Sequence, residues 1–347
     1  MEQALAQFLS NSHWAVLAAI IAASLFALAR AADWLVDEAV ALSERSGVPK
    51  VVIGATIVSL GTTTPEAAVS VAAAVQGIPG LALGNAVGSI ICDTGLILGL
   101  ACIIAPLKLN RRIVNRQGWI QFAAGVALVL ACFPWLNPGG VFREGGTLPQ
   151  SMGFVFLAAL AVYIWRSIMW ARQGDDGAEV AAHEKDVGAP VALVIAKLLA
   201  AVALVVLSAK VLIPAVAEAA MRLEVPEHVI AGTLVAFGTS LPELVTAVTA
   251  ARRGHGELAV GNVVGADILN VLFVAGAAAA VTPRGLHASG DFFTVFFPIM
   301  LGILIVFRLG IVFSGDHLRK PFGFVLLAAY AVFLLINSLM PGAGLAH

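Results

Sequence analysis

The chain has 347 residues, of which 60% are hydrophobic and only 12% charged, and its mean hydropathy is +0.96. A soluble domain carries about twice that charged fraction, so the composition excludes a soluble globular protein and predicts a polytopic membrane protein in contact with a lipid bilayer. The formal net charge of −1 gives no basic surface for nucleic acid and no strongly acidic surface.

Ten apolar segments are long enough to cross a bilayer, which takes about 20 helical residues. The first segment has no Lys or Arg before it, so we expect a retained helix and not a cleaved signal peptide. The first and sixth segments are the longest and should cross the bilayer at a steep tilt. The ten predicted spans are 13–41, 50–75, 80–105, 117–136, 151–171, 190–219, 228–251, 257–282, 291–310 and 321–340.

A polar, acidic segment at 173–189 divides the chain into two halves, 1–172 and 190–347, of five predicted spans each. We interpret it as a solvated linker, although it could also contact a partner. Of the Lys and Arg residues near the loop ends, fourteen fall on the side of the membrane that holds the linker and three on the opposite side. This asymmetry predicts a multi-pass protein of the plasma or inner membrane, with both termini outside and the linker in the cytoplasm.

Residues 53–100 recur as residues 230–277, with 19 of 48 positions identical in an alignment without gaps. Because each half has an odd number of spans, the second half must enter the membrane with the opposite polarity. The predicted fold is therefore all-α, with ten transmembrane helices in two inverted five-helix repeats. Such repeats place a binding site near the middle of the membrane, which is exposed alternately to each side.

Each repeat places a proline and a glutamate inside an apolar segment, as G-T-T-T-P-E (61–66) and G-T-S-L-P-E (238–243). A carboxylate in hydrocarbon is costly and usually marks an ion pathway. Proline lacks an N–H, so we expect freed backbone carbonyls in the preceding turns, which a bound cation could satisfy. The candidate oxygens are the carbonyls around Ser59, Gly61, Ala236 and Gly238, the hydroxyls of Thr62, Thr63, Thr239 and Ser240, and the carboxylates of Glu66 and Glu243.

Plainer explanations exist for these residues. A Thr or Ser in a membrane helix often donates back to its own helix, and a proline often only kinks it. A buried glutamate could pair with a basic residue, for which Lys197, Lys210 and Arg30 are available. Two glutamates at equivalent positions favour the ion pathway.

A second polar cluster follows in each repeat, where Asp93 aligns with Asn270. Asp267 lies one helical turn before Asn270, near the same face. Asn85 and Asn262 could be cation ligands or hydrogen-bonding links between helices. Glycines spaced by four predict close helix packing; they are Gly84, Gly88, Gly261 and Gly265.

These paired motifs resemble the α-repeats of the cation/calcium antiporter superfamily, specifically the sodium/calcium exchanger branch and its bacterial relatives. The resemblance implies that Glu66 and Glu243 bind calcium and sodium in turn. It also implies as ligands the hydroxyls of Thr62, Thr63, Thr239 and Ser240, the carbonyls of Ser59 and Ala236, the pair Asp93 and Asn270, and Ser89.

The chain departs from the family pattern at several of these positions. The Asp and Asn of the 93/270 pair are in the reverse of the usual prokaryotic order. Position 266 is Ala where Ser is usual, and Ile90 and Asp267 stand where Asn is common. These changes alter where sodium or protons would sit.

Carboxylates gathered in a dehydrated pocket repel one another, so the pocket must be neutralised by a cation or by protons before it moves. We therefore expect a calcium/sodium antiporter, in which helices 1 and 6 slide over helices 2, 3, 7 and 8. The transported Ca²⁺ and Na⁺, or H⁺, are its only expected bound ions, with no resident cofactor, and a single chain is sufficient. A calcium/proton antiporter is the alternative. A channel is disfavoured by the inverted repeats, and an enzyme by the lack of a His pair, a Ser/Lys dyad or a His-Glu-x-x-His motif.

Overall fold

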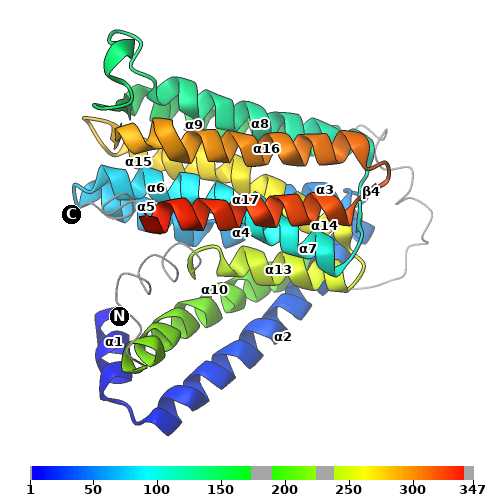
Figure 1. Cartoon of the computed structure of the whole chain (residues 1–347). Helices are drawn as coiled ribbons and strands as arrows, with labels where there is room; N and C mark the ends of the chain where they lie inside the picture. The colour runs from blue at the N-terminus through cyan, green and yellow to red at the C-terminus, as the bar shows by residue number, and fades with distance from the viewer. Residues whose placement is uncertain (1, 173–189, 224–237, 340–347) are drawn as a thin grey trace.

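The computed structural model describes residues 2–172, 190–223 and 238–339, and the chain in these ranges is mostly helical (Figure 1). Seven helices in this described part are long and apolar enough to cross a membrane. They comprise Trp14–Ser46, Pro79–Ile104, Gln150–Ala171, Val191–Arg222, Gly256–Ala280, Phe292–Phe313 and Lys320–Asn337.

The remaining three predicted spans differ from single uninterrupted helices. Segment 50–75 is divided into shorter pieces, and segment 117–136 corresponds to α8 (Arg111–Cys132), which begins earlier with two arginines. Segment 228–251 is described only from residue 238, where α13 (Leu241–Arg252) follows. The predicted linker 173–189 lies outside the described residues.

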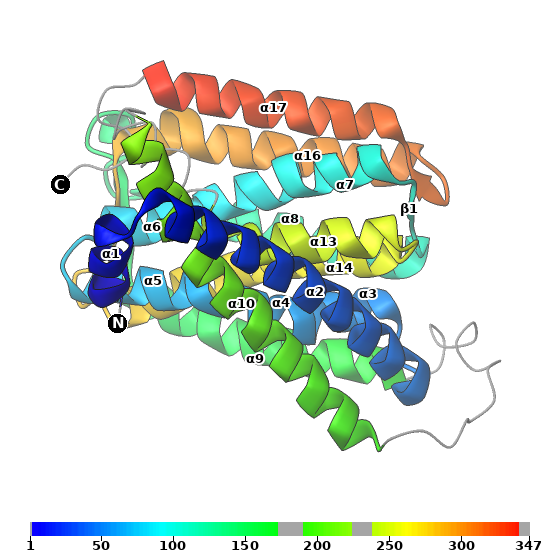
Figure 2. The same ribbon diagram turned by 90° about the horizontal axis from the view of Figure 1, so that it is seen from below.

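The two longest helices, α2 (Trp14–Ser46) and α10 (Val191–Arg222), have 33 and 32 residues, which confirms the predicted length of the first and sixth spans. They pack against each other and run diagonally across the other helices, as seen from below in Figure 2. A further helix that the sequence did not predict, α1 (Glu2–Asn11), precedes them. Arg222 of α10 donates to backbone carbonyls at the end of this helix, and so holds α1 against α10.

The most deeply buried helix is α14 (Gly256–Leu269), in which every residue except Glu257 is buried. It packs against α8, α13 and residues 50–58, at the start of the first repeat. A Cβ on Gly261 or Gly265 would overlap the backbone of that segment. The packing role predicted for these two glycines is therefore confirmed. The same prediction is wrong for Gly84 and Gly88, because among the described residues a Cβ there would meet one side-chain atom at 3.9 Å and nothing within 4 Å, respectively.

Segment 50–75 forms α3 (Lys50–Ile53), the π-helix η1 (Gly54–Val58), α4 (Ser59–Thr62) and α5 (Thr64–Val75). Pro65 lies in the first turn of α5, where an N–H would have no partner within the helix, so proline is well tolerated. Pro242 has the same place at the start of α13. Each proline thus begins a new helix that carries its glutamate in the first turn.

Two more π-helices occupy equivalent places in the repeats. One is η2 (Ile91–Leu98), between α6 (Pro79–Ile90) and α7 (Gly99–Ile104). The other is η5 (Asn270–Ala275), between α14 and α15 (Gly276–Ala280). A π-turn accommodates an additional residue and is frequent at functional sites. Hydropathy did not predict them.

The remaining helices surround this core, and short strands join their loops. The helices are α9 (Gln150–Arg172), the 3₁₀-helix η3 (Pro138–Gly140), the π-helix η6 (Phe292–Phe296), α16 (Phe297–Phe313) and α17 (Lys320–Leu339). Strand β1 (Leu107–Lys108) pairs antiparallel with β4 (His317–Leu318), and β2 (Gly146–Leu148) with β3 (Leu286–Ala288). The purely α-helical prediction is corrected by these two strand pairs.

Candidate functional site

Glu66 and Glu243 lie in the first turns of α5 and α13, and the exposed fraction of each is 1%. The N–H groups at a helix start carry partial positive charge, which favours a carboxylate there. The Thr63 hydroxyl donates to Glu243 Oε1 over 3.1 Å, and the two glutamates are close enough to repel each other. The structure therefore brings the two proline-glutamate motifs together, although they are 177 residues apart in the sequence.

Asp93 and Asn270 lie beside this pair. Asp93 is in the first turn of η2, and Asn270 is the first residue of η5. The Asn270 amide donates to Asp93 Oδ2 over 3.3 Å. Asp93 in turn repels both Glu243 and Glu66. The second polar cluster of each repeat thus joins the first in one buried group.

Several oxygens of this group are buried and have no hydrogen-bond partner among the described residues. An unpartnered buried oxygen costs free energy unless water or an ion satisfies it. Carboxylate, hydroxyl and amide oxygens are the ligands that Ca²⁺ prefers. These oxygens are Glu66 Oε2, Glu243 Oε2, Asp93 Oδ1, Asp267 Oδ1, Asn270 Oδ1, Ser89 Oγ and Ser240 Oγ, all from residues that the sequence singled out.

The other predicted hydroxyls have partners within the protein. Thr62 donates to the carbonyls of Val58 and Ser59 over 3.3 Å each, which is the plainer explanation for a threonine in a membrane helix. Thr239 donates to Asn85 Oδ1 over 3.4 Å. Both hydroxyl oxygens keep a lone pair with which a cation could be bound.

The expectation that proline frees the Ser59 carbonyl is wrong. This carbonyl accepts the N–H of Thr63 over 2.8 Å. Pro65 removes only its own N–H, and the carbonyl four residues before it belongs to Gly61. The equivalent carbonyl of the second repeat, that of Ala236, lies outside the described residues.

Asn85 acts as a link between helices. Its amide donates to the Glu66 carbonyl over 3.3 Å and to Ser70 Oγ over 3.0 Å, while its oxygen accepts from Thr239. Asn262 is fully buried, and neither amide atom has a partner in the described part of the chain. The two asparagines, equivalent in sequence, therefore have different surroundings.

Among the described residues, no salt bridge reaches any of the four buried carboxylates, which argues against the ion-pair explanation. Lys197 instead lies 3.8 Å from Glu38. No group of three or more His, Cys, Asp and Glu side chains in these residues is arranged to hold a metal ion. A cation here would therefore need hydroxyl, amide or carbonyl oxygens in addition to carboxylates.

Sequence reasoning missed two neutral residues that contact Asp267. Thr94 and Gln121 both donate to Asp267 Oδ2, with the Gln121 amide at 2.5 Å, and Gln121 also donates to Thr94 over 3.1 Å. A glutamine within the apolar span 117–136 was the available signal. All three side chains are buried.

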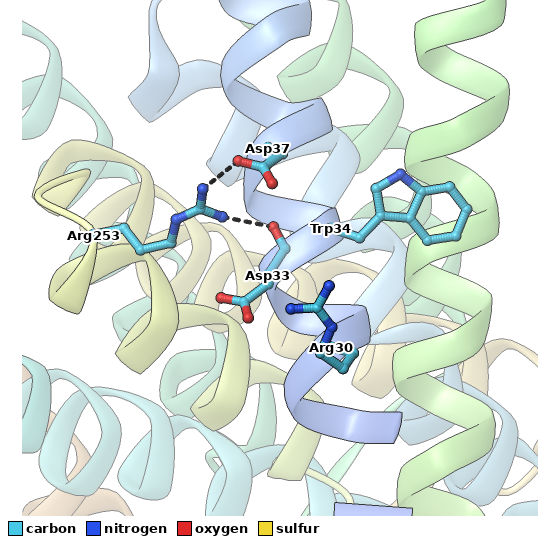
Figure 3. A pocket seen from close by; sticks show the side chains of 5 residues that line it. All are labelled: Arg30, Asp33, Trp34, Asp37 and Arg253. Atoms are coloured by element: carbon cyan, nitrogen blue, oxygen red, sulfur yellow. Dashed lines mark hydrogen bonds and ion pairs between the residues drawn. The ribbon is translucent and has the colours of Figure 1, made fainter. Parts of the chain in front are cut away.

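A cleft of about 530 Å³ lies away from these carboxylates, between α2 and the turn after α13 (Figure 3). Arg253 donates to the Asp33 carbonyl over 2.8 Å and forms an ion pair with Asp37. Arg30 and Trp34 complete its lining, so none of the predicted ligands faces it. In this cleft, Arg253 therefore links α2 to the turn after α13.

Comparison with known proteins identifies relatives along most of the chain. The model of the sodium/calcium exchanger protein family matches residues 16–169 and 193–339. The sodium/calcium exchanger MaX1 of Methanosarcina acetivorans is 31% identical, over 91% of this chain and 97% of that protein. The inner membrane protein YrbG of Escherichia coli is 33% identical, over 84% and 87%.

A solved structure of the sodium-calcium exchanger NCX_Mj, soaked with 10 mM Na⁺ and zero Ca²⁺, has a closely similar fold. It superposes with a TM-score of 0.76 and 25% sequence identity, covering 93% of this chain and 99% of that one.

Proposed function

The chain belongs to the sodium/calcium exchanger family, and we propose that it is a secondary antiporter that exchanges Ca²⁺ for Na⁺ across its membrane. The observation that carries this proposal is the group of buried, unpartnered oxygens on both repeats. Glu66 and Glu243 are the central ligands, and Asp93, Asn270, Ser89 and Ser240 supply further oxygens. The Thr62, Thr63 and Thr239 hydroxyls and the Ala236 carbonyl complete the proposed set, from which the Ser59 carbonyl is left out because it already accepts two hydrogen bonds.

The charges of this group support exchange over leak. Glu66, Glu243 and Asp93 repel one another in a buried site without a basic partner among the described residues. A bound cation removes that repulsion, whereas a site without one keeps it. The site therefore changes sides only when it is loaded, so the outward movement of calcium is tied to the inward movement of sodium.

The proposed architecture consists of inverted five-helix halves, 1–172 and 190–347, joined by a cytoplasmic linker at 173–189. The matching π-helices η2 and η5, and the nearly equal lengths of α2 and α10, support two equivalent halves. The lengthwise packing of α2 against α10 supports their movement as a pair over the core. All proposed ligands come from one chain, so a monomer is sufficient.

Reconstitution into liposomes tests the proposal. An inward calcium-45 flux should require sodium inside the liposomes and should stop when choline replaces it. Glu66→Gln and Glu243→Gln should each abolish this flux, because each removes one charge that the cation must balance. Glu144→Gln, the same change in an exposed loop residue, is the matched control. Wild-type flux in either site variant would refute the assignment of the ligands.

A calcium/proton antiporter is the second candidate. Asp93 and Asp267 support it, because each is a buried carboxylate without a basic partner in the described part of the chain. In the same liposomes, a pH gradient without sodium should then drive calcium uptake. Sodium-driven uptake that is unaffected by the pH gradient would reject this candidate.

A further inference from the structure

Three charged side chains of α2 line the cleft of about 530 Å³ between this helix and the turn after α13 (Figure 3). Asp33 and Asp37 are four residues apart, and Arg30 precedes Asp33 by three, so all three lie near one face of α2. They also lie inside the predicted span 13–41, where charged side chains are costly and usually have a function. This charged stripe faces the core at the place where α2 crosses it.

Arg253 contacts α2 at two successive turns of the stripe. It forms an ion pair with the Asp37 carboxylate and donates to the Asp33 carbonyl over 2.8 Å. The Asp33 carboxylate is close enough to attract Arg253, but it accepts no hydrogen bond and forms no ion pair among the described residues. Arg253 therefore uses one carboxylate of α2 and leaves a second, one helical turn away, without a partner in the described part of the chain.

The turn that carries Arg253 is fixed to the core helix α13. The N–H of Arg253 donates to the Thr249 carbonyl over 3.0 Å, and the N–H of His255 donates to the Ala250 carbonyl over 2.8 Å. Gly254 between them has a φ of 79°, which glycine adopts without strain. Because this turn is held in place, a movement of α2 along the core changes which residue of α2 faces Arg253.

The spacing of the stripe sets the length of such a movement. Four residues of an α-helix rise by about 6 Å, so sliding α2 by that distance toward its C-terminal end brings Asp33 to the place of Asp37. A further turn would bring Arg30 in front of Arg253, and the two like charges would repel each other. The stripe thus offers two attractive positions followed by a repulsive one.

The strength of the ion pair suits an exchange of partners. The side chains of Arg253 and Asp37 are 36% and 57% exposed, and an ion pair with this exposure is weak. A weak pair favours one position of α2 without preventing the helix from leaving it.

We propose that Asp37 and Asp33 are alternative partners of Arg253, which exchanges one for the other as α2 moves over the core by one helical turn. The inference rests on the proposed function, in which α2 and α10 move together. It adds the contact that defines each of the two positions.

Distances between spin labels test the exchange of partners. In Figure 1, α2 ends at the opposite end of the helices from the loop between α8 and α9, so labels at Glu44→Cys and Arg143→Cys measure the position of α2 along the core. Both residues are exposed, and the three native cysteines are buried and should stay unlabelled. Pulsed electron paramagnetic resonance of the protein in nanodiscs should give a shorter distance for the observed position and one up to about 6 Å longer for the second.

The two aspartates should act in opposite directions. Asp37→Asn should raise the ratio of the longer to the shorter distance about three- to fivefold, because it weakens the observed position alone. Asp33→Asn weakens the second position alone and should lower the ratio by a similar factor. In an Arg253→Gln background neither change should alter the ratio, because the shared partner is gone. Arg252→Gln, the same change in the exposed arginine next to it, is the matched control and should behave like the wild type.

Shifts of the two aspartate variants in the same direction, or no shift in either, would overturn the exchange of partners. Shifts that persist in Arg253→Gln would also overturn it, because they would not depend on the proposed contact. The labels report the position of α2 and not transport. Opposite shifts in a protein that shows no sodium-driven calcium flux would therefore refute the proposed function and support the two positions.

Discussion

Gly265 lies where α14 crosses η1 with no room for a side chain, so Gly265→Ala should disturb the site by displacing Ser59 and the backbone beside it. A Cβ at this position would stand 2.5 Å from Ser59 Oγ and 2.7 Å from the carbonyl carbon of Ala55. The nearest backbone atom, Ala55 Cα, would be closer still, and ordinary van der Waals contact begins at 3.4 Å, so the two backbones must separate by about 1 Å.

This displacement is large for a binding site, whose ligands must be held within about 0.5 Å. Overpacking of this kind costs about 1–3 kcal/mol, so the Tm should fall by roughly 2–10 °C. The same movement shifts Ser59 and the turn that carries Thr62 and Thr63, so we expect the calcium half-saturation concentration to rise at least about tenfold.

Calcium-45 flux in liposomes and thermal unfolding in detergent measure these two effects. Gly302→Ala in α16 is the matched control, because a Cβ there meets nothing within 4 Å among the described residues. If Gly265→Ala has the same Tm and the same calcium-45 flux as Gly302→Ala, α14 and η1 do not cross as closely as the structure shows.

Three further predictions concern single contacts. Thr63→Val removes the donor to Glu243 and should raise the calcium half-saturation concentration about tenfold in flux assays, whereas Thr63→Ser should keep most of the affinity. Arg222→Ala removes the contacts to the carbonyls that end α1, so deuterium exchange of residues 2–11 should accelerate while that of α10 stays slow; equal exchange would contradict the docking. Burial, and then the nearby Lys50, lower the pKa of His255 in the loop before α14. The unfolded state therefore binds the proton first, and the Tm should fall as the pH drops below about 6.5, less steeply in His255→Gln.

The sequence located most of the polar group because hydrocarbon makes polar residues conspicuous. Glu66, Glu243, Asp93 and Asn270 stand out in apolar segments and recur at one spacing, and the structure brings all four together. The error at Ser59 came from assigning the missing N–H to the wrong carbonyl. Counting four residues back from Pro65 identifies Gly61 without any structure.

Other features leave no trace in the pattern of one sequence. Thr94 aligns with Val271, so the repeat offers no second copy of it, and Gln121 lies outside the repeat. Their contact with Asp267 joins residues 173 and 146 positions apart, which only the folded chain brings together. The helix α1 is too short for a span prediction, and an apolar run has the same hydropathy in an α-helix and a π-helix.

Because the π-helices η2 and η5 lie inside the repeats, the number of residues in each repeat determines the direction in which the following helix faces. In an α-helix, each residue turns the chain by about 100°, so deleting one residue after Asp93 would rotate α7 by more than a quarter of a revolution relative to the carboxylate. An insertion after Asn270 would do the same to α15. The two copies of the repeat can therefore differ in composition much more freely than in length, which accounts for the 48 aligned positions without a single gap.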